Sequence, residues 1–143
     1  MKKIYTTSII VCVVLLLGCS KDFLKRYDKR IIGTWRISDI NRNGFGGDID
    51  NLPFQEGGRF TFMTDGSLTY DNGAGATFQG SWDIQKKYVG DGTELRTLQI
   101  TAVDFTNQRV LSEYYDDMTF AGTDHFKARI YSGWHTYITH FRR

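Results

Sequence analysis

The chain has 143 residues, of which 24% are charged, and 18 lysines and arginines against 16 acidic residues give a formal net charge of +2. A balance so near neutral gives no indication of nucleic-acid binding, which needs a concentrated basic patch. Both cysteines, Cys12 and Cys19, lie in the N-terminal segment, so we expect no disulfide, thiolate metal site or cysteine nucleophile in the rest of the chain.

Residues 1–18 have the layout of a secretory signal peptide. Two lysines near the N-terminus precede an apolar run at 9–17 and the small residue Gly18. The run is too short to span a bilayer, which takes about 20 residues. Because Cys19 follows, the segment resembles the signal of a bacterial lipoprotein, with a lipobox at 16–19. This resemblance implies lipidation of Cys19 and export to the outer membrane, with the leaflet left open.

Removal of residues 1–18 leaves 125 residues, enough for one domain, in which 16 basic residues balance 16 acidic ones. Residues 19–30 are predicted to form a lipidated tether and one or two helical turns, because apolar residues recur there at helical spacing. Residues 31–143 are predicted to form a single all-β domain.

The β prediction depends on runs of β-branched and aromatic residues separated by turn signals such as Asn72-Gly73. The predicted strands cover 33–40, 58–64, 67–71, 76–85, 94–104, 109–119, 124–131 and 134–142. Most connections are short, so strands adjacent in sequence are expected to pair. About eight such strands favour an antiparallel up-and-down barrel. A β-sandwich is the alternative, although its Greek-key crossovers need longer connections.

One connection, from Asn41 to Gly57, is long and glycine-rich and carries Phe45, Leu52 and Phe54. Loops of this length in compact domains are often functional. We expect these apolar residues either to form a lid over a ligand cavity or to plug a filled barrel.

The aromatic residues on the strands are expected either to fill the barrel or to line a ligand cavity. A barrel of about eight strands is either filled by side chains or holds one small ligand. The residues predicted to contact a ligand are Phe45, Phe54, Phe60, Phe62, Phe78 and Trp82.

Gly33-Thr34-Trp35 opens the first predicted strand, and the chain ends on a strand closed by Arg142 and Arg143. This layout resembles the lipocalin-like domains of bacterial lipoproteins, especially those of the Bacteroidetes type. In that superfamily a Gly-x-Trp motif sits at the closed end of the barrel, where the tryptophan packs against an arginine. The resemblance implies these roles for Gly33, Trp35 and either Arg142 or Arg143, with a cation–π contact at the barrel floor.

Motifs for catalysis are absent from the sequence, which has neither Gly-x-Ser-x-Gly nor His-Glu-x-x-His. Asp116 and Asp117 are adjacent on a predicted strand, so they face opposite sides and cannot form an acid–base pair. If Ser132-Gly133 is a two-residue hairpin loop, His125 lies opposite His140, but two imidazoles are too few for a stable metal site.

We therefore expect a non-enzymatic lipoprotein without cofactor or metal, attached to the membrane through Cys19, that binds a small apolar or amphipathic ligand at the cell envelope. The alternative is an interaction, accessory or inhibitor lipoprotein with a filled barrel. The sequence leaves the oligomeric state open.

The lipoprotein prediction has a direct test at Cys19. Cys19→Ala removes the thiol that would carry the lipid, so the protein should remain unprocessed and should incorporate no labelled palmitate in cells. Incorporation that persists in this variant would contradict the assignment.

Overall fold

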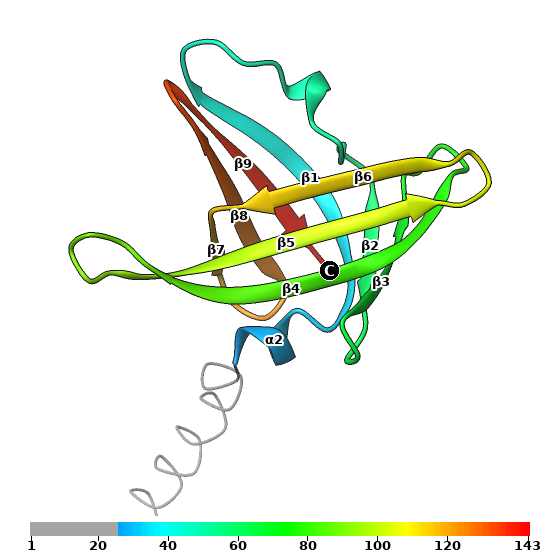
Figure 1. The fold of residues 1–143 in the computed structure, drawn as a ribbon, viewed down its shortest axis with the longest axis horizontal. Helices are drawn as coiled ribbons and strands as arrows, with labels where there is room; N and C mark the ends of the chain where they lie inside the picture. The colour runs from blue at the N-terminus through cyan, green and yellow to red at the C-terminus, as the bar shows by residue number, and fades with distance from the viewer. Residues whose placement is uncertain (1–25) are drawn as a thin grey trace, which may run out of the picture.

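A computed structural model describes residues 26–143, so the predicted signal peptide and Cys19 lie outside the described residues. The described chain forms one nine-stranded antiparallel sheet, strongly curled, with a short helix at one end (Figure 1). Its elements are α2 (Tyr27–Arg30), β1 (Gly33–Gly44), the 3-10 helix η1 (Ile49–Asn51), β2 (Arg59–Phe62), β3 (Ser67–Asp71), β4 (Thr77–Tyr88), β5 (Glu94–Asp104), β6 (Arg109–Tyr115), β7 (Asp117–Phe120), β8 (His125–Ser132) and β9 (His135–Arg142). No helix within 26–143 is long and apolar enough to cross a membrane.

The strand order is β6-β5-β4-β3-β2-β1-β9-β8-β7, so nearly every strand pairs with its neighbour in sequence. Short turns produce this order. At the β2–β3 turn, for example, the Asp65 carboxylate accepts a hydrogen bond from the Ser67 backbone N–H, and Gly66 has a φ of 83°. A left-handed conformation of this kind favours glycine. The all-β prediction and the order of the strands are confirmed.

The sheet is not closed into the expected barrel, because the single strand predicted at 109–119 is interrupted at Asp116. β6 pairs only with β5, and β7 pairs only with β8. The Asp116 backbone N–H donates to the Arg129 carbonyl at 2.8 Å, and its carboxylate accepts from the Tyr131 N–H at 2.9 Å. These bonds turn the chain from one edge of the sheet to the other, which gives nine strands instead of about eight.

The β8–β9 hairpin also differs from the prediction. Ser132 pairs with His135, so the loop residues are Gly133 and Trp134. The predicted loop, Ser132-Gly133, was wrong by one residue. As a result His125 pairs with Arg142 and not with His140.

Aromatic rings fill the concave face of the sheet. Phe126 stacks on Phe141 with 4.3 Å between ring centroids, and Phe60 stacks on Tyr70 at 4.5 Å. The largest fully buried side chains are Trp35, Tyr70, Tyr115, Phe54, Phe60, Phe62, Phe78, Phe126 and Phe141. Each such ring removes a large apolar area from water, so this aromatic cluster is the main source of stability.

Trp35 is fully buried near α2, and its indole N–H donates to the Ile31 carbonyl at 2.6 Å. The Arg143 guanidinium lies 4.2 Å from the centroid of the indole and donates to the carbonyl oxygens of Arg30 and Ile32 at 2.8 and 2.7 Å. Of the two candidate arginines, Arg143 makes this contact, whereas Arg142 pairs with Arg36 and His125 in the ladders of the sheet.

Gly33 precedes this tryptophan with a φ of 116°, a conformation that side chains rarely adopt. A Cβ at this position would stand 3.7 Å from Arg143 Nη2. The backbone conformation, more than the space, therefore favours glycine here.

The buried position of Trp35 predicts a large loss of stability on truncation. Trp35→Ala should lower the free energy of unfolding by about 3–5 kcal/mol, measured by urea denaturation, because it leaves a cavity among packed rings. Trp134→Ala is the matched control, since Trp134 is 88% exposed and should change stability little. Equal effects of the two substitutions would contradict this account.

Candidate functional site

Four of the rings predicted to contact a ligand pack against other aromatic rings or bond to the backbone. Phe60, Phe62 and Phe78 are buried, and Phe60 stacks on Phe62 with centroids 5.7 Å apart. Trp82 is half-buried, and its indole N–H lies 3.1 and 3.0 Å from the carbonyl oxygens of Met63 and Ser67. Trp82 therefore holds the β2–β3 turn, while the phenylalanines fill the interior.

The long loop also contributes to the filling. Phe54 is 2% exposed and packs edge-on against Phe60 and Tyr70 at 5.0 and 4.9 Å. Two side chains from the same loop fix its course: Gln55 donates to the Leu52 carbonyl at 2.6 Å, and Glu56 accepts from the Ile40 N–H at 2.9 Å. The buried position of Phe54 favours a loop that plugs the interior over a loop that forms a lid.

Phe45, predicted to form part of a lid, instead has an 88% exposed side chain at the far end of β1. Its backbone is fixed, because its N–H donates to the Trp134 carbonyl at 3.2 Å. Glycine at position 44 allows this approach, since a Cβ there would lie 2.1 Å from the same oxygen. Trp134 is also 88% exposed, and Tyr131 is 53% exposed.

We call these three residues, Phe45, Tyr131 and Trp134, the aromatic tip. They lie at the adjoining ends of β1 and the β8–β9 hairpin, while α2 lies at the other end of the molecule (Figure 1). The sequence prediction included Phe45 alone. A tryptophan in a two-residue turn is the signal that could have identified this end of the sheet.

A pair of histidines occupies the outer face of β8 and β9. His125 Nε2 lies 3.3 Å from His140 Nδ1, although the two residues are not directly opposed. Burial is the main cause that lowers the pKa of both imidazoles, and the positive charges of Lys127 and Arg142 lower them further. Within residues 26–143 no group of three or more His, Cys, Asp or Glu side chains is placed to hold a metal ion.

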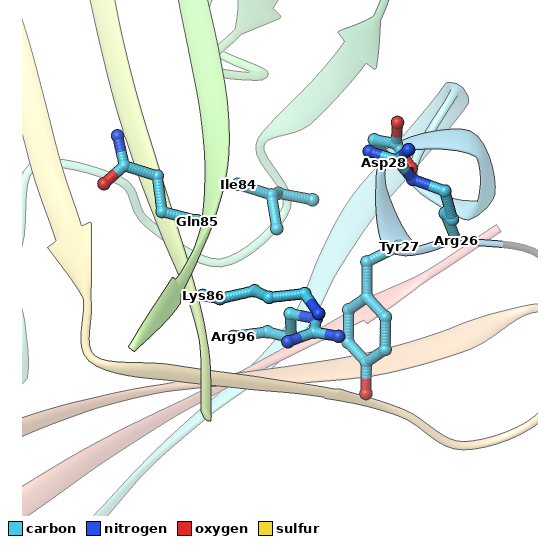
Figure 2. A pocket seen from close by; sticks show the side chains of 7 residues that line it. All are labelled: Arg26, Tyr27, Asp28, Ile84, Gln85, Lys86 and Arg96. Atoms are coloured by element: carbon cyan, nitrogen blue, oxygen red, sulfur yellow. Dashed lines mark ion pairs between the residues drawn. The ribbon is translucent and has the colours of Figure 1, made fainter. Parts of the chain in front are cut away.

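A pocket with a volume of about 530 Å³ opens between α2 and the β4–β5 hairpin (Figure 2). It is lined by Arg26, Tyr27, Asp28, Ile84, Gln85, Lys86 and Arg96. The side chains of Lys86 and Arg96 extend toward the Tyr27 ring, and the Arg96 guanidinium lies 5.4 Å from the centroid of that ring. No local pattern in the sequence predicts this pocket, because it depends on how α2 lies against the β4–β5 hairpin.

Glu94 is the acidic partner of both cations. Its carboxylate lies 3.1 Å from Lys86 Nζ, forms an ion pair with Arg96, and accepts a hydrogen bond from the Tyr88 hydroxyl at 2.9 Å. The hydrogen bonds from Tyr88 and Lys86 are the main causes that lower the pKa of Glu94, so its carboxylate stays ionised at neutral pH.

Comparison with known proteins assigns no relative: no family model, no curated protein and no solved structure matches the chain.

The position of Phe54 leads to a prediction about the loop. Phe54→Ala should lower the free energy of unfolding by about 3–5 kcal/mol in urea denaturation, since it removes a ring from the filled interior. Phe45→Ala, in the same loop but exposed, should change it by no more than about 0.5 kcal/mol. If Phe54→Ala leaves stability unchanged and increases binding of a fluorescent fatty-acid probe, the loop is a lid and not a plug.

Proposed function

We propose that the protein is a lipid-anchored, non-enzymatic interaction module of the cell envelope, which meets a partner protein through the aromatic tip. In this proposal the curled sheet is a rigid support related to lipocalin-like domains, and its interior holds no ligand. The exposure of Phe45, Tyr131 and Trp134 on a fixed backbone carries the proposal.

The filled interior favours an interaction module over a carrier. A carrier needs a cavity lined by apolar groups that are free to contact the ligand. Here Phe54, Phe60 and Tyr70 contact one another at centroid distances of 4.5 to 5.0 Å. A ligand in this position would have to displace rings that already stabilise the fold.

The aromatic tip has the composition of an interface centre. Tryptophan, tyrosine and phenylalanine are enriched at protein–protein interfaces, and tryptophan and tyrosine are frequent among the residues that dominate binding energy. The hydrogen bond between the Phe45 N–H and the Trp134 carbonyl joins the two segments that carry the tip. A fixed backbone reduces the conformational entropy lost on binding.

The predicted anchor is compatible with this use of the tip. The tether from Cys19 leads into α2, at the end of the molecule away from the aromatic tip (Figure 1). A lipid at Cys19 would therefore hold the α2 end near the membrane and direct the tip toward proteins in the surrounding compartment.

Photo-crosslinking in living cells tests this proposal. The full chain is produced with Trp134 replaced by the photo-reactive amino acid p-benzoylphenylalanine, and irradiation should give a discrete protein adduct. The matched control carries the same replacement at Phe105, which is 74% exposed on a different turn, and should give none. Phe45→Ala in the Trp134-labelled chain should weaken the adduct several-fold, since it removes part of the same contact surface.

A different result would support the carrier. If irradiation gives no adduct at position 134, and if native mass spectrometry shows a small apolar molecule retained by the purified protein, the interaction proposal fails.

A further inference from the structure

Two like charges face each other in the β4–β5 hairpin. Lys86 and Arg96 are direct partners in the ladder, and both lie on the face of the sheet that carries Ile84 and Leu98 one pair further along. Like charges directly opposite each other destabilise a strand pair unless an anion lies between them. Glu94 supplies only one negative charge for these two cations.

The Arg96 guanidinium has more N–H donors than the Glu94 carboxylate can accept. Arg96 Nη1 is buried and pairs with the Glu94 carboxylate. A guanidinium has five N–H donors in a rigid fork, so a single carboxylate does not occupy all of them. Two cations therefore share one carboxylate, which leaves a positive charge and further guanidinium donors available for a second anion.

The pocket also has room for more than a simple ion. Its walls include the Tyr27 ring and the Ile84 side chain, so it offers a partly apolar surface next to the cations (Figure 2). Arg26, the third cation of the lining, lies 3.3 Å from the Asp28 carboxylate and so adds little net charge. Lys86 and Arg96 are therefore the groups that can hold an anion.

We propose that this pocket binds the phosphate group of a phosphate ester, with Arg96 as the bidentate donor and Lys86 as the second cation. The planar guanidinium matches the geometry of phosphate, and the ammonium contributes a point charge. Tyr27 and Ile84 contact the organic part of the ester. This site does not involve the aromatic tip, so its test is separate from the test of the interaction proposal.

The location indicates which ester is available. Cys19 precedes Arg26 by seven positions, and seven residues span at most about 25 Å. If Cys19 is lipidated, the pocket therefore lies within reach of the membrane surface, where the headgroup of an anionic phospholipid offers this chemistry. A soluble phosphate ester offers the same phosphate group.

Calorimetric titration of the full chain in a phosphate-free maltoside detergent tests the site, with glycerol phosphate and short-chain phosphatidylglycerol as probes. Arg96→Gln should weaken binding at least about tenfold, the effect of losing a charge-assisted hydrogen bond. Glu94→Gln should strengthen binding several-fold, because it removes the competing carboxylate. Lys87→Gln is the matched control: Lys87 is next in the chain, faces the other side of the sheet and lies 3.6 Å from Asp116.

The two probes identify the source of the ester. Binding of phosphatidylglycerol alone supports a membrane headgroup, and equal binding of both probes supports a soluble ester. The site is refuted if neither probe binds, if Arg96→Gln binds like the unaltered protein, or if Glu94→Gln weakens binding while thermal melts show that it is folded.

Discussion

The contact between Trp35 and Arg143 is the interaction on which the rest of the structure depends. The indole fills the end of the curled sheet near α2, packing edge-on against Phe126 with centroids 4.7 Å apart. The guanidinium covers the indole and donates to the carbonyl oxygens of Arg30, the last residue of α2, and of Ile32, just before β1. One arginine thereby satisfies acceptors that β structure leaves unpaired and fixes the direction in which β1 begins.

The concave face of the sheet changes its chemistry along the β4–β5 hairpin. Toward the middle of the sheet this face carries Phe78 and Ile100, both fully buried. Toward the end of the hairpin the same face carries Lys86 and Arg96, beyond the last ring of the interior. The alternation of side chains that builds the core thus also places two cations at its rim, close to α2.

Much of the fold follows from local patterns in the sequence. Alternating phenylalanines such as Phe60 and Phe62 predicted the buried faces, and Asp65-Gly66 predicted a turn that the structure contains. Other features depend on partners distant in the sequence. The break at Asp116 requires acceptor and donor groups of Arg129 and Tyr131, which no pattern within 109–119 contains. The candidate sites were harder to predict, because they depend on which residues face each other across strands. A one-residue error in the predicted β8–β9 turn, for example, changes every residue pair in that hairpin.

The pairing of β1 with β9 has a consequence for the kinetics of folding. Arg143 and Ile32 are hydrogen-bonded although they lie 111 positions apart, and the β1–β9 ladder joins segments that are also far apart in the sequence. Contacts of such long sequence separation slow folding, because the entropy of loop closure must be lost before they form. Until β9 arrives, β1 exposes an unpaired edge and Trp35 lacks its covering cation. A chain that emerges from its N-terminus would therefore hold this edge open until β9 emerges, the interval in which it is most exposed to aggregation.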